Sequence, residues 1–238
     1  MRAPDLAAER ALWGSGIGLI AGIDEVGRGP LAGPVAAGAV VLPRIDRITK
    51  QYRWLRDVRD SKQLTAAARE ELSGYIWGNA LAAGVAFVPV SVIDRIGIAE
   101  ASRQAWLGAI SELLVKPAHL LLDAFSLPAC RLPQTPIIRG DEKIMSIACA
   151  SVIAKVARDR LMAEQHGEYP GYGFVTNKGY ATPEHFAALD RLGPCQLHRR
   201  SFSPVKEMLA GGIPLLSALT FEGASQCPPL TPCPAPSI

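Results

Sequence analysis

The segment AGIDEVGRGPLAGP, residues 21–34, joins an apolar run to two acids and a glycine-rich turn. The apolar residues before Asp24 are typical of a buried strand, and VAAGAVVL directly after this stretch is typical of a second one. We therefore predict strands over 18–24 and 35–42, joined by the glycine-rich turn. Two adjacent acids at the end of a core strand are costly to bury unless something neutralises them.

Two later strands are also expected to end in acids. The apolar run at 118–125 ends near Asp123, and the short run at 135–143 ends near Asp141. If these strands are neighbours of the first, their carboxylates converge and repel one another unless a cation is present. Oxygen ligands suit Mg²⁺ and Mn²⁺, and two such ions about 3.5–4 Å apart would clamp a phosphodiester and an attacking water. The candidate catalytic and metal-binding residues are therefore Asp24, Glu25, Asp123 and Asp141.

Glu25 raises a geometric question, because successive strand residues point to opposite faces of a sheet. It can join Asp24 in one site only if the strand twists or breaks at Glu25, which Gly27 permits. Otherwise Glu25 takes no part in the site.

The glycine turn has other interpretations. Gly27-x-Gly29-x-x-Ala32 matches a relaxed dinucleotide fingerprint, but that motif needs a helix directly afterwards, and here prolines and a strand follow. A Walker loop would need Gly-Lys-Ser/Thr, which does not follow. A hairpin turn with solvated acids stays open as an alternative.

Several residues are candidates for contacts with a nucleic acid. Arg28 between two glycines can reach a phosphate, and the backbone there can approach a sugar closely. RDSKQL, residues 59–64, offers further phosphate contacts, with a solvated helix entry as the alternative reading. Tyr180 in NKGYATPEH is either a core residue or an exposed ring that packs on a sugar or base. The candidate substrate-binding residues are Gly27, Arg28, Gly29, Arg59, Ser61, Lys62, Lys143 and Tyr180.

The remaining pattern predicts an α/β domain with a mixed sheet. A third strand is expected over 80–90, and helices are expected over 64–74, 99–115 and 146–162. The last helix has Ser146 as a candidate N-cap, and its small residues, among them Ala150, would let it lie close on the sheet. The predicted domain organisation is a lead-in over 1–17, one catalytic domain over 18–210 and a disordered proline-rich tail over 211–238.

Composition restricts the class of protein. The 238 residues carry a net charge of +3 and are 49% hydrophobic, as in a soluble globular protein that permits a polyanionic partner without requiring one. Five scattered cysteines without a CxxC pair favour a reducing cytoplasm over a disulfide framework or zinc site. We see no bilayer-spanning run and no secretory signal, and we expect a cytoplasmic protein with no membrane partner.

Six sequence blocks follow one another along the chain: GIDEVGRGPLAGPV, RDSKQL, LLDAF, GDEK…SIACASVIAKVARDR, YGFVTNKGYATPEH and HRRSFSPVK. In this order they resemble bacterial ribonuclease HII, and the resemblance covers about residues 18–209. The resemblance implies a ribonuclease-H-like fold, with a mixed five-stranded sheet flanked by helices and a C-terminal helical region. It also implies metal-dependent cleavage of RNA in RNA–DNA hybrids and at single ribonucleotides embedded in duplex DNA.

The resemblance also implies roles for individual residues. The family's metal ligands fall on the four carboxylates named above, its ribonucleotide-recognition motif on Gly27–Arg28–Gly29, and its sugar-stacking tyrosine on Tyr180. Cleavage is expected on the 5′ side of the ribonucleotide, leaving a 3′-hydroxyl and a 5′-phosphate, with Mn²⁺ or Mg²⁺ as cofactor and a monomer as the working state. Glu142 departs from the family pattern and would add negative charge beside the metals.

Three alternatives concern the function and partners. Ribonuclease HIII is a rival within the same class, although a long N-terminal extension is missing. A non-catalytic nucleic-acid-binding module is a rival from another class, but it would not need all four acids. ALTF, residues 218–221, is a loose match to a peptide that docks on a replication clamp.

Overall fold

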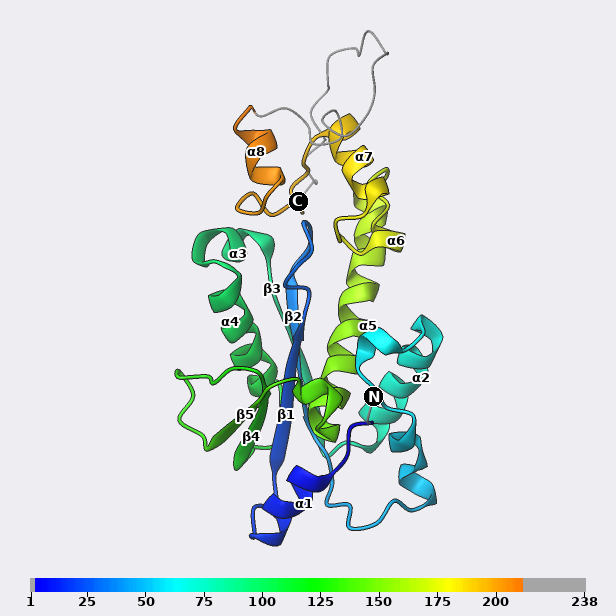
Figure 1. The fold of residues 1–238 in the computed structure, drawn as a ribbon, viewed down its shortest axis with the longest axis vertical. Coiled ribbons are helices and arrows are strands. Elements are labelled where there is room, and N and C mark those ends of the chain that lie inside the picture. Colours follow the sequence, from blue (N-terminus) through cyan, green and yellow to red (C-terminus); the bar gives the residue numbers. More distant parts are fainter. Residues whose placement is uncertain (1–2, 212–238) are drawn as a thin grey trace. The chain divides into compact units, whose positions relative to one another are not determined.

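The computed structural model of the chain describes residues 3–211. Its five strands form one sheet in the order β3–β2–β1–β4–β5 (Figure 1). Pairing is antiparallel between β1, β2 and β3, and parallel between β1, β4 and β5. The predicted mixed five-stranded sheet is therefore confirmed. The strands are β1 (Ile20–Val26), β2 (Val35–Val41), β3 (Ala82–Val88), β4 (His119–Asp123) and β5 (Gln134–Ile137).

Eight α-helices are found in the described part of the chain, where none is long and apolar enough to cross a bilayer. They are α1 (Ala7–Gly14), α2 (Ala66–Asn79), α3 (Val90–Ile96), α4 (Ile98–Ser111), α5 (Met145–Glu168), α6 (Phe174–Asn177), α7 (Pro183–Leu192) and α8 (Val205–Leu209). Short 3₁₀ segments lie at Lys50–Arg56, Ser61–Gln63 and Gly140–Glu142.

The chain forms two compact units, and each is described by itself. Among the described residues, unit 1 comprises 3–28, 35–88 and 99–158, and it contains the whole sheet. Among the described residues, unit 2 comprises 29–34, 89–98 and 159–211.

Helices cover both faces of the sheet in unit 1 (Figure 1). Gly38 of β2 lies against α5, because a Cβ at this position would stand 2.3 Å from the Ala150 carbonyl oxygen. Gly84 of β3 lies against α4, where a Cβ would stand 2.6 Å from the Ala109 carbonyl oxygen. Gly84 pairs with Ala39, the neighbour of Gly38, so α4 and α5 lie on opposite faces. The predicted close approach of a helix to the sheet through Ala150 is confirmed.

Helix α5 begins at Met145, so Ser146 lies in its first turn and the N-cap predicted there is wrong. The backbone N–H of Ser146 instead donates to Oε1 of Glu9, a buried residue of α1, at 2.8 Å. A carboxylate at this position satisfies a helix N–H that has no partner within the helix, and it interacts favourably with the helix dipole. Together with the buried Trp13, Glu9 makes the N-terminal helix part of the core of unit 1.

Unit 2 has its own apolar core, to which Leu31, Met162, Phe174 and Leu189 contribute. The segment 29–34 is anchored within this unit by backbone and side-chain hydrogen bonds. The buried Arg199 guanidinium donates twice to the Gly33 carbonyl oxygen, at 3.0 and 2.9 Å. This segment includes Gly29, the last residue of the glycine–arginine–glycine motif.

Candidate active site

The two adjacent acids of β1 point to opposite faces of the sheet. The ladder between β1 and β2 stays regular through Val26, with Asp24 opposite Gly38 and Glu25 opposite Ala37. Because Gly38 faces α5, Asp24 faces α5 as well, and Glu25 faces the other way. The predicted twist or break of the strand at Glu25 is therefore wrong, because pairing continues one residue beyond it.

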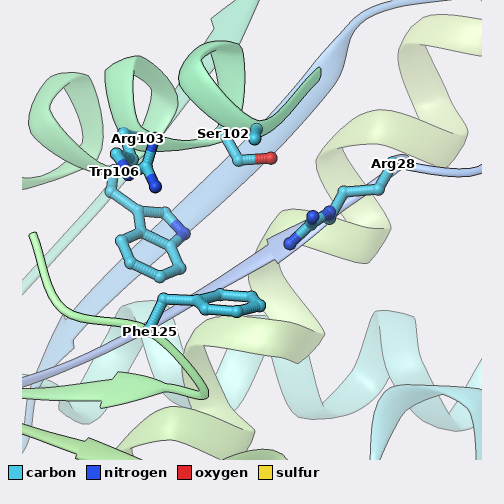
Figure 2. Close-up of a pocket in the computed structure, with 6 residues that line it drawn as sticks. Arg28, Ser102, Arg103, Trp106 and Phe125 are labelled. Carbon is cyan, nitrogen blue, oxygen red and sulfur yellow. The ribbon is translucent and has the colours of Figure 1, made fainter. Parts of the chain in front are cut away.

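Glu25 is held by two side chains on the α4 face. The Trp106 indole N–H donates to Glu25 Oε2 at 2.8 Å, and Arg28 Nη1 donates to Oε1 at 3.0 Å. Figure 2 shows Arg28 and Trp106 at the edge of a small pocket, with the Phe125 ring beside them. The guanidinium carbon of Arg28 lies 5.4 Å from the centre of that ring. Both oxygens of Glu25 are thus engaged, and Arg28 packs on an aromatic surface.

Asp123 ends β4 next to Asp24. The parallel register pairs Ile23 with Leu122, so the following residues, Asp24 and Asp123, lie side by side on the same face. Asp123 Oδ1 accepts a hydrogen bond of 2.7 Å from the backbone N–H of Gly140. This bond ties the end of β4 to the turn that carries the next acid.

Asp141 lies in the 3₁₀ turn Gly140–Glu142, whereas β5 ends at Ile137. The expectation that a strand would extend to Asp141 is therefore wrong. The turn leads directly into α5, and Asp141 is buried there.

Burial and mutual repulsion shift the pKa values of these acids upward. The pKa of Asp24 is raised well above its ordinary value, first by burial and then by the charges of Glu25 and Asp123. Burial also raises the pKa of Asp123, although the Gly140 N–H opposes it. The pKa of Asp141 is raised by burial and by Asp123. The three aspartates therefore lie close enough to repel one another, and the charge of Glu25 adds to this repulsion at Asp24 and Asp123.

Lys62 is the cation beside this cluster. Its ammonium nitrogen lies 3.7 Å from Asp141 Oδ2 and 4.0 Å from Asp60 Oδ1, and its side chain is 78% exposed. Burial by itself would lower the pKa of Lys62, but these carboxylates outweigh burial and raise it. Lys62 can therefore stay charged at neutral pH while its ammonium remains accessible to a phosphate.

Ser61 has a different environment from the one expected of a phosphate contact. It is buried, and its hydroxyl oxygen lies 2.9 Å from that of Ser151 on α5. Ser151 in turn hydrogen bonds to Asp24. As it lies, Ser61 supports the orientation of Asp24 through Ser151.

Sequence reasoning missed Asp60, which stands between two residues that it singled out. Asp60 is buried, accepts the backbone N–H of Lys62 at 3.0 Å, and raises the pKa of Asp123 and Asp141. The available signal was an acid inside an otherwise basic stretch. Ser151 was also missed, because a serine in a helix of small residues carries no distinguishing pattern.

The remaining charged candidates of unit 1 are engaged locally. The Arg59 guanidinium donates to two neighbouring backbone carbonyls, both at 2.7 Å. The Lys143 ammonium donates to the Ile138 carbonyl oxygen at 2.7 Å. Glu142 forms an ion pair with Arg139, so its charge is partly neutralised and the extra negative field expected from it is weakened.

Three residues with a positive backbone φ lie within two positions of candidate site residues. Within residues 3–211, the non-glycine residues with positive φ are Ala124, Arg139 and Lys178, at 59°, 58° and 52°. Ala124 directly follows Asp123, and the other two stand two residues before Asp141 and Tyr180. Such conformations cost energy and are concentrated at functional sites. They therefore support assigning function to these turns.

The glycine–arginine–glycine motif combines a constrained glycine with an open one. Gly27 has a φ of 90°, and a Cβ there would stand 2.2 Å from Arg158 Nε. A Cβ on Gly29 would meet nothing within 4 Å.

Tyr180 belongs to unit 2, where it is 39% exposed, so it is not a core residue.

The carboxylates suit a divalent cation by their chemistry. Within the described residues, no group of three or more His, Cys, Asp or Glu side chains has the arrangement of a formed metal site. Asp24, Asp123 and Asp141 nevertheless offer hard oxygen donors whose mutual repulsion a cation would relieve. Glu25 would have to release Arg28 or Trp106 in order to join them.

Comparison with known proteins identifies the class first. The fold matches that of the ribonuclease H2 of Pyrococcus horikoshii OT3, with a TM-score of 0.67, 26% identity, and coverage of 81% of this chain and 98% of that one. It also matches the RNase HII in a PCNA:RNase HII complex from Archaeoglobus fulgidus, with a TM-score of 0.64, 27% identity, and coverage of 78% and 95%. The mixed sheet and its flanking helices thus define a ribonuclease-H-like fold.

The family follows from the sequence comparison. The family model described as Ribonuclease HII matches residues 21–205, so the chain belongs to the ribonuclease HII family. The Ribonuclease HII of Anaeromyxobacter sp. (strain Fw109-5) is 51% identical over 204 residues. That match covers 86% of this chain and 62% of the relative, so the chain spans about three fifths of the relative's length.

Proposed function

We propose that the protein cleaves the RNA strand of RNA–DNA hybrids, and duplex DNA at single embedded ribonucleotides, with the coupled carboxylates as its catalytic centre. The observation that carries the proposal is the cluster of Asp24, Asp123 and Asp141, held by three segments on one face of the sheet. Repulsion within this cluster is a cost that a stability role would not explain.

Mg²⁺ or Mn²⁺, when bound, would activate the attacking water and stabilise the leaving oxygen of the phosphodiester. Asp24, Asp123 and Asp141 would hold the ions, and the Ser151 hydroxyl would keep Asp24 oriented. Glu25 is included as a fourth ligand on the strength of the family pattern. Lys62 lies where its ammonium could contact a phosphate at the acidic cluster and partly offset the negative charges there.

Recognition of the ribonucleotide is assigned to the glycine–arginine–glycine motif and to Tyr180. The 2′-hydroxyl is the group that distinguishes RNA from DNA, and it both donates and accepts hydrogen bonds. The open space at Gly29 allows a sugar to approach the backbone, and the exposed Tyr180 ring can pack on a sugar. Arg28, Arg59 and Lys143 supply positive charge for the phosphate backbone.

The experiment that tests the catalytic centre is cleavage of an RNA–DNA hybrid in Mg²⁺, in Mn²⁺ and in a chelator. We expect cleavage with either cation and none in the chelator. Asp123→Asn should slow the reaction by orders of magnitude while the protein still binds the hybrid, since phosphate contacts supply most of the affinity. Undiminished cleavage by this variant, or cleavage in the chelator, would remove the cluster from the mechanism.

The partners outside the nucleic acid stay at the level of prediction. The structural relative from Archaeoglobus fulgidus is in a complex with PCNA, which makes a sliding clamp a reasonable partner to test for this chain. The stretch that suggested clamp docking, residues 218–221, lies outside the described residues. A monomeric state also remains a prediction.

A further inference from the structure

Two buried histidines of unit 2 form a pair that the proposed chemistry does not use. His185 and His198 are 0% and 1% exposed, and their Nε2 atoms lie 3.0 Å apart. Aromatic rings enclose them: Phe174 meets His185 edge-on at 5.6 Å, and Tyr172 lies 5.0 Å from His198 between ring centres. A polar pair buried in this way needs its hydrogen bonds satisfied.

The hydrogen bonds determine where each ring carries its proton. The backbone N–H of Cys195 donates to His198 Nδ1 at 2.9 Å, so this nitrogen is an acceptor and the His198 proton is on Nε2. That proton is donated to His185 Nε2, so the His185 proton must be on Nδ1. His185 Nδ1 then donates to the Tyr180 carbonyl oxygen at 2.8 Å. The result is a one-way chain that runs from Cys195 through both rings to the backbone of Tyr180.

Additional hydrogen bonds join the same turn to the segment 29–34. The carbonyl oxygen of Gly179 accepts from Leu31 N–H at 2.8 Å and from Ala32 N–H at 3.3 Å. Ala32 also forms a β-bridge with His198. Hydrogen bonds and the peptide bond between Gly179 and Tyr180 therefore form a closed ring, which links Tyr180, the two histidines, Ala32 and Gly179.

This ring of bonds restricts the backbone conformation at Gly179 and Tyr180. Gly179 has a φ of 84°, and a Cβ there would stand 2.4 Å from the Ala32 carbonyl oxygen. The Gly179 N–H is itself held by the Asn177 side chain at 2.8 Å. The Tyr180 backbone is thus fixed relative to the segment that begins at Gly29.

We propose that His185 and His198 are positioning residues for ribonucleotide recognition, and that their hydrogen-bonded pair sets the Tyr180 ring relative to the Gly29–Pro34 segment. This inference rests on the proposed role of Tyr180. A purely structural pair would contribute to stability but would not affect cleavage through Tyr180. The two roles therefore differ in what a substitution does beyond stability.

The first test uses substitutions at His185 in the full chain. His185→Leu removes the donor to Tyr180, whereas the amide of His185→Asn can still donate from a position near that of Nδ1. On a duplex with one ribonucleotide we expect His185→Leu to lower kcat by about tenfold or more, because small misplacements in a site are costly. KM should change little, and His185→Asn should recover most of the loss. Equal kcat for all three proteins, or Asn as impaired as Leu in a folded protein, would overturn the proposal.

A double-mutant cycle separates this inference from the proposed role of Tyr180. If the histidines act through Tyr180, His185→Leu should have little further effect on kcat in a Tyr180→Ala background. If the two substitutions together lower kcat by the product of their separate factors, the histidines do not act through Tyr180 and the inference fails. If Tyr180→Ala alone cuts at the wild-type rate, the proposed role of Tyr180 fails first, and that failure is recognisable without any histidine variant.

The second test does not depend on activity. ¹⁵N NMR of the four histidines in the full chain at neutral pH reports the tautomer of each ring. We expect His185 with its proton on Nδ1 and His198 with its proton on Nε2, assigned by loss of the His185 signals in His185→Asn. The opposite tautomers, or a doubly protonated ring, would break the directional chain and overturn the proposal.

Discussion

Asp24 is a buried acid with Glu25 and Asp123 as like-charged neighbours. This environment explains why its ionised carboxylate destabilises the fold and why it suits a cation. Its raised pKa means that the ionised carboxylate is penalised in the folded state. A cation bound at the cluster would remove that penalty. Without a cation, the same residue lowers the stability of the protein at neutral pH.

Asp24→Asn should therefore abolish most cleavage and yet raise the melting temperature measured in a chelator. A group with a raised folded-state pKa stabilises the fold below that pKa and loses this contribution as the pH rises. The stability gain of the variant should thus grow as the pH rises above about 4, where the unfolded-state carboxyl ionises. Asp46→Asn, at an exposed residue paired with Arg44, serves as the control and should change neither property. A variant that melts lower at every pH would contradict the electrostatic account.

The two glycines of the glycine–arginine–glycine motif should respond differently to alanine. Gly27→Ala should destabilise the protein, because the positive φ and the contact with Arg158 both oppose a Cβ. Gly29→Ala should fold normally, because the space around it is open. We expect it to cut a single embedded ribonucleotide poorly while keeping its affinity for an all-DNA duplex. Thermal melts and binding titrations of both variants distinguish these outcomes, and wild-type cleavage by Gly29→Ala would exclude a close approach of substrate at this position.

Among the secondary-structure elements, the point where a strand or turn ends determines where the carboxylate that it carries lies. The sequence predicted acids at strand ends. This holds for Asp123, whereas β1 continues past Asp24 to Val26 and a 3₁₀ turn carries Asp141. The alternation of strand residues correctly identified Glu25 as the difficult case. The side on which it binds could not be predicted, because Trp106 comes from a helix distant in sequence.

Helix α5 depends on α1 for its first turn, and this dependence can be measured. Glu9→Ala would leave the buried Ser146 N–H without its acceptor, which should lower the free energy of unfolding by about 1–3 kcal/mol. Glu9→Gln keeps an acceptor oxygen and should lose less. Glu100→Ala, on the exposed first turn of α4, is a control that should stay within about 0.5 kcal/mol of wild type. Urea denaturation measures all three, and equal losses for Ala and Gln would indicate that the charge of Glu9, not its hydrogen bond, is what matters.

At the scale of the whole molecule, the family and the sheet were predictable, but several interactions that support the site were not. Hydrophobic runs and six motif blocks identify the strands and the ribonuclease HII family. The contact between Glu9 and α5 joins residues 137 positions apart, and a single sequence holds no signal for it. The proton positions on His185 and His198 depend on bonds that form only after folding. Sequence motifs thus indicate the candidate reacting groups, and packing decides how those groups are held.

The chain beyond residue 211 lies outside the described part, and its sequence predicts no role in catalysis. Its proline density cannot support a packed core. A protein ending at residue 211 should therefore cut a short hybrid at the rate of the full chain, as measured in parallel single-turnover reactions. A clear loss of rate would show that the C-terminal residues contribute to the site.

We propose that the carboxylate centre and a 2′-hydroxyl-sensing loop act on the same nucleotide. The most direct measurement is to map cleavage of a duplex with one ribonucleotide beside the matched all-DNA duplex, in Mg²⁺ or Mn²⁺. We predict a single cut on the 5′ side of the ribonucleotide, leaving a 3′-hydroxyl and a 5′-phosphate, and a rate at least about 10⁴-fold lower on the all-DNA duplex. Cleavage at other positions, or comparable cleavage of both duplexes, would contradict the account.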